Sequence, residues 1–364
     1  MTFRKAALAT SLILALTTVT PLQAADFSTE YKAYQTELEA RNFQAALAHI
    51  EAAYQAAESV YGKNSRDYAN LGFSLANTLA KVHHPSLNGN SAQNARALAL
   101  YRSGIAIYQQ LPDVTPTEII TQTINAIEVT DNAIAQTELL EDALKLAKAQ
   151  NQPELVAATQ VQGFESIAHS FAYREKHNVM LKEAFDFFQT NAATYPKQYL
   201  HATYLMAQIK YAKKKYTAAE TYFLDVLKQT KELNFSHPLA LGAHARLVDI
   251  YEQQGKSAQA TPHCIAIGSM TPWNNNQDPV PLFRKEPEYP MSAARARKDG
   301  YAKMKFTITP EGSITNIEVL ETQGSSAFGT KGVEALAKWR YAPKFENGKA
   351  VPTESVVQLD YKIL

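Results

Sequence analysis

Residues 286–320 read EPEYPMSAARARKDGYAKMKFTITPEGSITNIEVL, and this stretch decides the fold of the C-terminal part of the chain. Between Tyr301 and Thr309 apolar and polar residues alternate, which is the period of a half-buried β-strand. The segment Thr309–Gly312 places Pro second and Gly fourth, as a type I turn prefers. A second strand from Ser313 to Glu321 then completes an antiparallel hairpin. The buried face of the first strand would hold Ala302, Met304, Phe306 and Ile308.

Two further segments extend this hairpin to a small α+β domain. Residues 328–343 read FGTKGVEALAKWRYAP and contain a predicted helix that Ser325 caps. Trp339 follows the helix and would fill the core. The apolar stripe of the helix would comprise Val333, Leu336 and Ala337.

A last strand begins near Glu354, in the segment ESVVQLDYKIL, and adds a third member to the antiparallel sheet. Since successive side chains of a strand point to opposite faces, its residues fall into two sets. One face would carry Val357, Leu359, Tyr361 and Ile363, and the other Val356, Gln358, Asp360 and Lys362.

The order and spacing of these features resemble the C-terminal domain of the TonB family, periplasmic proteins that touch outer-membrane transporters. The matching features are Tyr289-Pro290 before a short helix, Gly300 before a strand, the Pro310-Glu311-Gly312 turn, the segment Trp339–Pro343, and Gly348. The resemblance covers residues 283–364.

In that family, the resemblance implies, an extended partner segment adds to the sheet beside the C-terminal strand, and residues around the Tyr-Pro motif also touch the partner. Carried over to this chain, the candidate partner-binding residues are Glu286, Glu288, Tyr289, Pro290, Val356, Val357, Gln358, Leu359, Asp360 and Tyr361. The best-known members have glutamines where Glu286 and Glu288 stand. We expect these two carboxylates to repel acidic partner segments and to favour basic ones.

The start of the chain has the pattern of a secretory signal peptide, residues 1–24. Arg4 and Lys5 precede a run of apolar and small residues that ends at Thr20, and Leu22-Gln23-Ala24 is the predicted cleavage site. At about fifteen residues the run is shorter than the ~20 residues of a membrane span. We therefore expect a periplasmic protein, with a retained inner-membrane anchor as the alternative. Cleavage changes the formal charge of +1 to −1, which gives no general attraction to nucleic acid.

Residues 25–270 read as one helix after another and are similar to tetratricopeptide repeats, in which a small Ala lets two helices approach closely. The alternative is an irregular helical bundle. In the segments beginning at Asn42, Lys215 and Gly255, an Ala is followed by larger apolar residues at helical spacing. The anchor positions of the predicted repeats are Ala46, Ala97, Ala143, Ala184, Ala219 and Ala260.

Residues 271–282 contain Pro, Asn and Asp and predict a short exposed linker to the C-terminal domain. Typical TonB proteins instead carry a long Pro-rich spacer between a membrane helix and this domain. This departure favours an adaptor over a transducer of proton-motive energy. The fold class is α+β overall, with an all-α repeat array followed by the small sheet domain.

The sequence contains none of the common nucleophile, phosphate-loop, zinc or CxxC motifs. Cys264 is its only cysteine, which excludes an internal disulfide and favours a buried thiol. His83 and His84 are adjacent in a predicted loop, and His263 and Cys264 point to different faces of a helix. We therefore expect no metal, no cofactor and no enzymatic activity.

Two functional hypotheses follow. The first is a periplasmic protein–protein interaction adaptor that assists outer-membrane transport by binding a partner through strand addition. The second is a membrane-anchored energy transducer of TonB type. The expected partners are an outer-membrane transporter or another envelope protein segment, peptidoglycan, or a second copy of the chain through the C-terminal strand.

Overall fold

The computed structural model describes residues 21–83, 91–231, 233, 236–271, 273–274 and 277–363. The predicted signal peptide lies outside these ranges except for its last four residues, and His84 of the predicted loop lies outside them as well. The chain divides into two compact units, one that ends at Ala184 and one that begins at Phe185.

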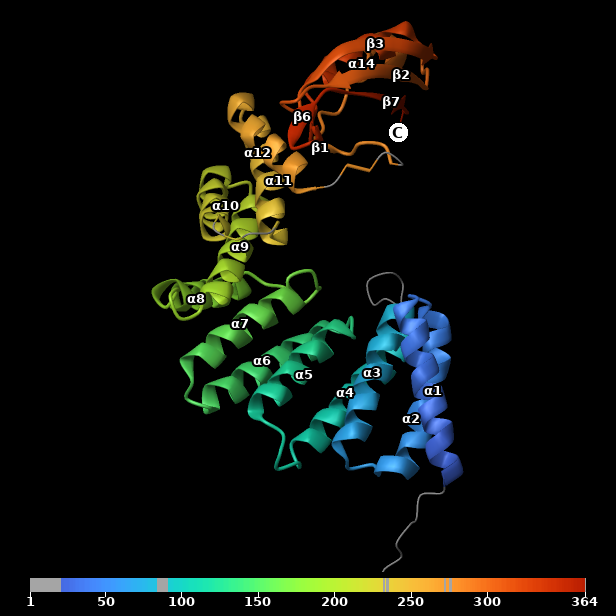
Figure 1. The fold of residues 1–364 in the computed structure, drawn as a ribbon, viewed down its shortest axis with the longest axis vertical. Helices are drawn as coiled ribbons and strands as arrows, with labels where there is room; N and C mark the ends of the chain where they lie inside the picture. The colour runs from blue at the N-terminus through green and yellow to red at the C-terminus, as the bar shows by residue number, and fades with distance from the viewer. Residues whose placement is uncertain are drawn as a thin grey trace, which may run out of the picture. The chain divides into compact units, whose positions relative to one another are not determined.

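The first unit consists of helices that pack as neighbours in chain order (Figure 1). Its closest pairs are α1 with α2, α3 with α4, and α5 with α6. The helices are α1 (Pro21–Glu39), α2 (Phe43–Tyr61), α3 (Arg66–Val82), α4 (Ser91–Tyr108), α5 (Pro116–Glu128), α6 (Ala133–Ala149), α7 (Pro153–Ile167) and the first part of α8 (Lys176–Thr190).

Polar side chains fix where several of these helices begin. The Oγ of Ser65 accepts a hydrogen bond from the N–H of Tyr68 at the start of α3. At α5, Thr115 and Glu118 form a reciprocal capping box, and Pro116 occupies the first helical position. Such caps satisfy amide groups that have no partner within the helix.

The second unit begins with the rest of α8 and continues with two helical hairpins. These are α9 (Pro196–Ala212) with α10 (Tyr216–Thr230), and α11 (Pro238–Gln253) with α12 (Ser257–Met270). From α1 to α12 the described residues contain no strand, as the sequence predicts.

All six predicted anchor alanines are buried, and all except Ala184 on α8 lie on the second helix of a closely packed pair. Ala46, Ala219 and Ala260 lie one turn inside α2, α10 and α12, as expected. The other three anchors lie farther inside their helices, Ala97 in α4, Ala143 in α6 and Ala184 in α8.

The C-terminal domain belongs to the second unit and contains three small sheets. Its elements are β1 (Pro281–Phe283), α13 (Met291–Arg295), β2 (Gly300–Ile308), β3 (Ile314–Gln323), α14 (Ser326–Leu336), β4 (Arg340–Tyr341), β5 (Lys344–Glu346), β6 (Lys349–Val351) and β7 (Thr353–Tyr361). The predicted three-stranded antiparallel sheet is present, in the order β3-β2-β7. The pairs β1–β4 and β5–β6 are additional, and β1 takes up the last two residues of the predicted linker.

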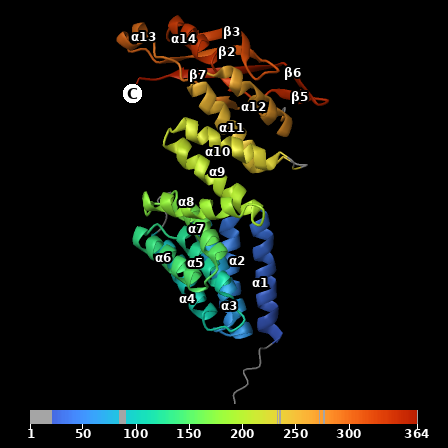
Figure 2. The same ribbon diagram turned by 90° about the vertical axis from the view of Figure 1, so that its left-hand side faces the viewer.

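One face of the three-stranded sheet is buried, and α14 packs over β2 and β3 on it (Figure 2). The four predicted core residues of β2 are all at most 1% exposed, and Trp339 joins them. The predicted helix stripe needs a correction, because α14 ends at Leu336 and Ala337 is exposed beyond it. Phe328 and Gly332 take its place on the buried side. Ile363 is exposed for the same reason, since β7 ends at Tyr361.

We predict that Ala260→Leu destabilises the second unit, because Ala260 is fully buried within the α11–α12 core. Overpacking of this kind costs about 1–3 kcal/mol. Ala258→Leu is the matched control, because Ala258 lies on the same helix and is exposed. Urea unfolding of the full chain measures both variants, and an equal stability of the two would contradict close helix packing at Ala260.

Candidate functional site

Strand β7 forms one edge of the three-stranded sheet, and its free edge is the centre of the candidate site. Its nine residues pair with β2 in continuous register from Thr353 to Tyr361. No other strand in the described part of the chain pairs with it. The opposite edge, β3, is different, because its pairing with β2 shifts register twice. Bulges of this kind disfavour the addition of another strand, so β7 is the regular open edge.

The two faces of β7 differ as the sequence predicts. Leu359 and Tyr361 lie on the core face and are 1% and 3% exposed. Val356, Gln358 and Asp360 lie on the outer face and are exposed, and the side-chain amide of Gln358 donates to Asp360 Oδ1 at 2.8 Å. Val357 is half-buried at the core margin.

The segment 284–290 contacts α14 and Trp339, and it reaches β7 at Tyr361. At one end Trp339 Nε1 donates to the carbonyl of Lys285 at 2.8 Å. At the other end the Tyr289 ring lies 5.9 Å from the Tyr361 ring, edge to face. The structure therefore brings Tyr289 of the Tyr-Pro segment next to Tyr361 of the last strand.

Within this set, four residues are structural supports. Pro290 is buried and precedes α13, and Tyr289 donates its hydroxyl to the carbonyl of Lys298 at 2.6 Å. Tyr361 donates to the carbonyl of Phe328 at 3.0 Å and stacks on its ring. Together with Leu359 they hold the segment against the sheet, and the exposed members of the set form its surface.

Glu286 and Glu288 are exposed, but each has a cationic neighbour. Glu286 lies 3.1 Å from Arg284 Nε, and Glu288 lies 3.0 Å from Lys331 Nζ. The hydrogen bond from Lys331 lowers the pKa of Glu288 from its ordinary value. These two carboxylates are therefore partly neutralised, which weakens the expected repulsion of acidic partners.

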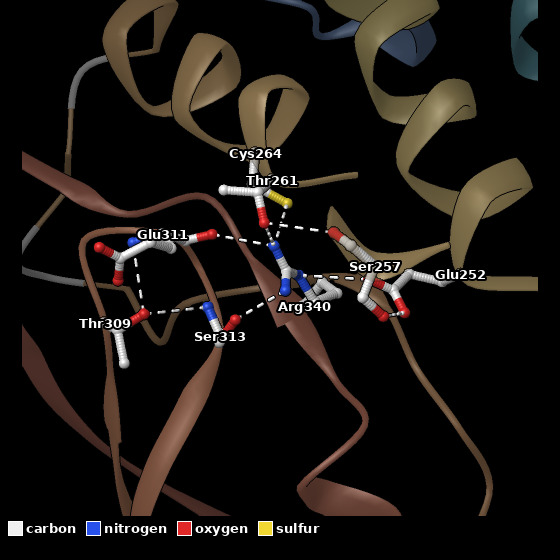
Figure 3. Close-up of polar contacts among 8 residues, drawn as sticks. All are labelled: Glu252, Ser257, Thr261, Cys264, Thr309, Glu311, Ser313 and Arg340. Carbon is white, nitrogen blue, oxygen red and sulfur yellow. Dashed lines mark hydrogen bonds and ion pairs between the residues drawn. The ribbon is translucent and has the colours of Figure 1, made fainter. Parts of the chain in front are cut away.

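A buried arginine near the site has no counterpart in the sequence predictions (Figure 3). The guanidinium of Arg340, in β4, donates to Ser313 Oγ at 2.6 Å, to Thr261 Oγ1 at 2.8 Å and to the carbonyl of Glu311 at 3.0 Å. Its Nε lies 3.5 Å from Glu252 Oε1, and both side chains are 7% exposed. We call these residues the Arg340 cluster. It joins α11 and α12 to the turn between β2 and β3.

Two glycines allow the backbones to approach at this joint. A Cβ on Gly312 would lie 2.1 Å from the carbonyl oxygen of Tyr341 and 2.9 Å from Cys264 Cβ, and its φ is +75°. A Cβ on Gly268 would lie 2.4 Å from the carbonyl oxygen of Pro343. Cys264 is fully buried beside Arg340, and this burial raises the pKa of its thiol. The predicted buried thiol is confirmed, and its role is packing within the joint.

A pair of histidines lies next to this joint on α11 and α12. His244 Nδ1 and His263 Nδ1 are 2.7 Å apart, and the His263 ring stacks on Tyr251. Burial lowers the pKa of His244, and burial together with His244 lowers the pKa of His263 to about 4. Sequence reasoning missed this contact because the two residues are nineteen positions apart on different helices.

No group of three or more His, Cys, Asp or Glu side chains in the described residues is arranged to hold a metal ion. The described helices also include none that is long and apolar enough to cross a membrane.

The comparisons with known proteins concern the domain that carries this edge. Residues 285–363 match the family model for the Gram-negative bacterial TonB protein C-terminal. These residues form a TonB-type C-terminal domain. The TonB-type domain is similar to protein TonB of Pseudomonas aeruginosa, 34% identical over 30% of this chain and 31% of that protein. It is also similar to protein TonB of Escherichia coli, 35% identical over 18% of this chain and 27% of that protein. Each of these relatives is thus matched over less than a third of its length.

Solved structures match both parts of the chain. The solution structure of the Pseudomonas aeruginosa TonB C-terminal domain is 37% identical, covers 24% of this chain and 90% of that one, and gives a TM-score of 0.22. Aspartyl phosphate phosphatase F from Bacillus subtilis is 14% identical, covers 68% of this chain and 66% of that one, and gives a TM-score of 0.47.

We predict that Arg340→Met strongly destabilises the second unit, because it leaves the buried Glu252 carboxylate without its cation. Loss of one partner of a buried pair costs about 3–5 kcal/mol. Urea unfolding of the full chain, followed by the fluorescence of Trp273 and Trp339, reports on this unit. Adding Glu252→Met should restore much of the loss, since no charge is then buried. If the single and the double variant lose the same stability, the pair is not coupled.

Acid should weaken the second unit through the histidine pair. The folded pKa of His263 is about 4, below the ordinary value of 6.5, so its contribution is complete above pH 6.5 and is lost as the pH falls toward 4. The thermal midpoint of the wild type should therefore fall more between pH 7.5 and pH 4.5 than that of the His244→Phe/His263→Phe variant. Equal acid sensitivity of the two proteins would exclude this role.

Proposed function

We propose that this chain is a protein–protein adaptor of the cell envelope that binds an extended segment of its partner by strand addition to β7. The observation that carries the proposal is the regular and unpaired edge of β7. An edge strand offers backbone N–H and C=O groups that an incoming strand can pair with. β7 contains no proline, so each of its residues keeps its backbone N–H.

The side chains at this edge suit a partner segment that contains both apolar and polar residues. Val356 is 43% exposed on the outer face and offers an apolar contact to a neighbouring strand. Gln358 and Asp360, on the same face, keep the strand hydrated when it is unpaired. On the core face the Tyr289 ring lies 5.9 Å from the Tyr361 ring at the end of β7, so this end of an added strand would lie near the Tyr-Pro segment.

The TonB-type domain supports an outer-membrane transporter, or another envelope protein with an extended segment, as the partner. Cleavage of residues 1–24 would release the adaptor into the periplasm. The helical hairpins of the second unit carry this domain through the Arg340 cluster, so the domain is not loosely tethered to them. We propose that the helices serve as a scaffold that presents the β7 edge.

Photo-crosslinking of the full chain in cells tests strand addition. A benzoylphenylalanine at Val356, next to the β7 edge, should capture a partner in the envelope, and sequencing of the adduct should locate the crosslink in an extended segment. Leu320, on the bulged β3 edge, is the matched control, because it is 48% exposed and should capture little. Equal capture at both positions would argue against β7 as the binding edge. If Val356 crosslinks only to a second copy of the chain, the β7 edge is a homodimer contact and the adaptor proposal is wrong.

Proline substitutions at Val357 and Gln358 sharpen the test. Because neighbouring amides of a strand point to opposite edges, one of the two substitutions removes an amide that faces β2 and the other removes one that faces the partner. One variant should lose stability. The other should keep its thermal midpoint and lose the Val356 crosslink. If both proline variants fold and both still crosslink through Val356 as the wild type does, strand addition is contradicted.

Fractionation of the same cells, followed by mass spectrometry, distinguishes an adaptor from an anchored transducer. The protein from the periplasmic fraction should have the mass of residues 25–364. An intact chain recovered only with the inner membrane would instead favour the transducer.

A further inference from the structure

A groove of about 450 Å³ lies in the first unit, between α4 and α6. Its volume is within the range of small-molecule sites in proteins, roughly 300–1,000 Å³. Helix α5 packs against both α4 and α6 and contributes to the floor between them (Figure 1). All of the lining residues lie between Arg102 and Ala149, in a range that the structure describes without a gap.

The floor of the groove is mostly apolar. Leu139 of α6 is 5% exposed, and Ile105 of α4, Ile119 of α5 and Leu146 of α6 are half-buried. Thr123 also lines the floor, but its hydroxyl donates to the carbonyl of Ile119 at 2.8 Å and is used within α5. The floor therefore offers a ligand an apolar surface that is contributed by three helices.

Charged side chains of both signs surround this floor. They are Arg102 on α4 and Glu138, Asp142 and Lys145 on α6. Arg102 Nη2 lies 3.5 Å from Glu138 Oε2, so this ion pair bridges the two walls of the groove. Asp142 and Lys145 follow Glu138 along α6, and both are exposed. A ligand in the groove would therefore meet a carboxylate and an ammonium group above an apolar floor.

Asp142 and Lys145 are spaced as the two terminal charges of a short peptide are. They lie three positions apart on α6, so their Cβ atoms are about 5–6 Å apart on one face of the helix. An extended dipeptide has a length of about 7 Å, which places its ammonium and its carboxylate at a similar separation. A free amino acid holds both charges on one Cα, where they are closer together than the two side chains.

We propose that this groove binds a short peptide that has free termini and apolar side chains. The N-terminal ammonium of the peptide pairs with Asp142, and its C-terminal carboxylate pairs with Lys145. The apolar side chains of the peptide lie against Ile105, Leu139 and Leu146. A ligand with a single charge would engage only one of the two charged side chains. This site is independent of strand addition at β7, which belongs to the other unit.

Isothermal titration of the full chain with four dipeptides tests the proposal. Leu-Leu has both terminal charges and two apolar side chains. N-acetyl-Leu-Leu lacks the ammonium, Leu-Leu amide lacks the carboxylate, and Gly-Gly lacks the side chains. Each capped peptide should bind about two- to fivefold more weakly than Leu-Leu, as the loss of one exposed ion pair implies. Gly-Gly should bind at least about tenfold more weakly, because it buries no apolar side chain.

Three results of this titration would overturn the proposal. If Leu-Leu does not bind, the groove is not a peptide site. If either capped peptide binds as tightly as Leu-Leu, the ligand is not recognised by both of its terminal charges. If Gly-Gly binds as tightly as Leu-Leu, the apolar floor takes no part in binding.

Variants assign each terminal charge to its side chain. Asp142→Asn should weaken the binding of Leu-Leu about two- to fivefold but should not weaken that of N-acetyl-Leu-Leu, which has no ammonium. Lys145→Gln should weaken the binding of Leu-Leu by a similar factor but should not weaken that of Leu-Leu amide. Lys148→Gln is the matched control, since Lys148 is exposed on α6 and does not line the groove.

All three variants should keep the thermal midpoint of the wild type, because these side chains are exposed. Wild-type affinity for Leu-Leu in both Asp142→Asn and Lys145→Gln would place the binding elsewhere and contradict the proposal. An equal loss for Leu-Leu and for the capped peptides would contradict the pairing of these two side chains with the termini.

Discussion

The buried guanidinium of Arg340 constrains the second unit more than any other single group. Removing a guanidinium and a carboxylate from water costs several kcal/mol each, and their mutual attraction offsets this cost only when the remaining donors are also satisfied. Here Ser313, Thr261 and the carbonyl of Glu311 accept from Arg340, and Ser257 Oγ donates to Glu252 at 2.7 Å. Its Nε faces Glu252 Oε1 in an ion pair at 3.5 Å without a hydrogen bond. Because these partners come from α11, α12 and the β2–β3 turn, Arg340 reaches all of them only when the helices and the sheet domain meet in one arrangement.

This arrangement determines which surfaces of the sheet domain remain open. The helices contact β1, β5 and β6, and the turn beside Arg340 is covered by α12. β7 lies on the other side of β2 from β3 and takes no part in these contacts. Of the two edges of the sheet, β3 is protected by its bulges, whereas β7 is regular. An unprotected edge promotes aggregation, so the regular β7 edge agrees with the proposed role in strand addition.

The sequence predicts the sheet domain well because its signals are local. Alternation from Tyr301 to Thr309 and the Ser325 cap are confirmed, since strand period and helix caps depend on neighbouring residues. The alanine anchors are confirmed as buried for the same reason. The Arg340 cluster could not be predicted from the sequence, because Arg340 and Thr261 are 79 positions apart and no local pattern marks either residue as a partner of the other. The β1–β4 pair was missed because its strands are two or three residues long.

Charge alone is a poor basis for selecting a partner at the β7 edge. Glu286 and Glu288 have side chains that are 74% and 80% exposed, and ion pairs this exposed contribute little, about 0–1 kcal/mol. A basic partner residue would have to displace Arg284 or Lys331 from these carboxylates. The net gain in binding free energy would therefore be small. Backbone pairing along β7 gives affinity without regard to sequence. Under the proposed strand addition, selectivity would come from fit against the exposed Val356 side chain on the outer face and the Tyr289 ring beside Tyr361 on the core face.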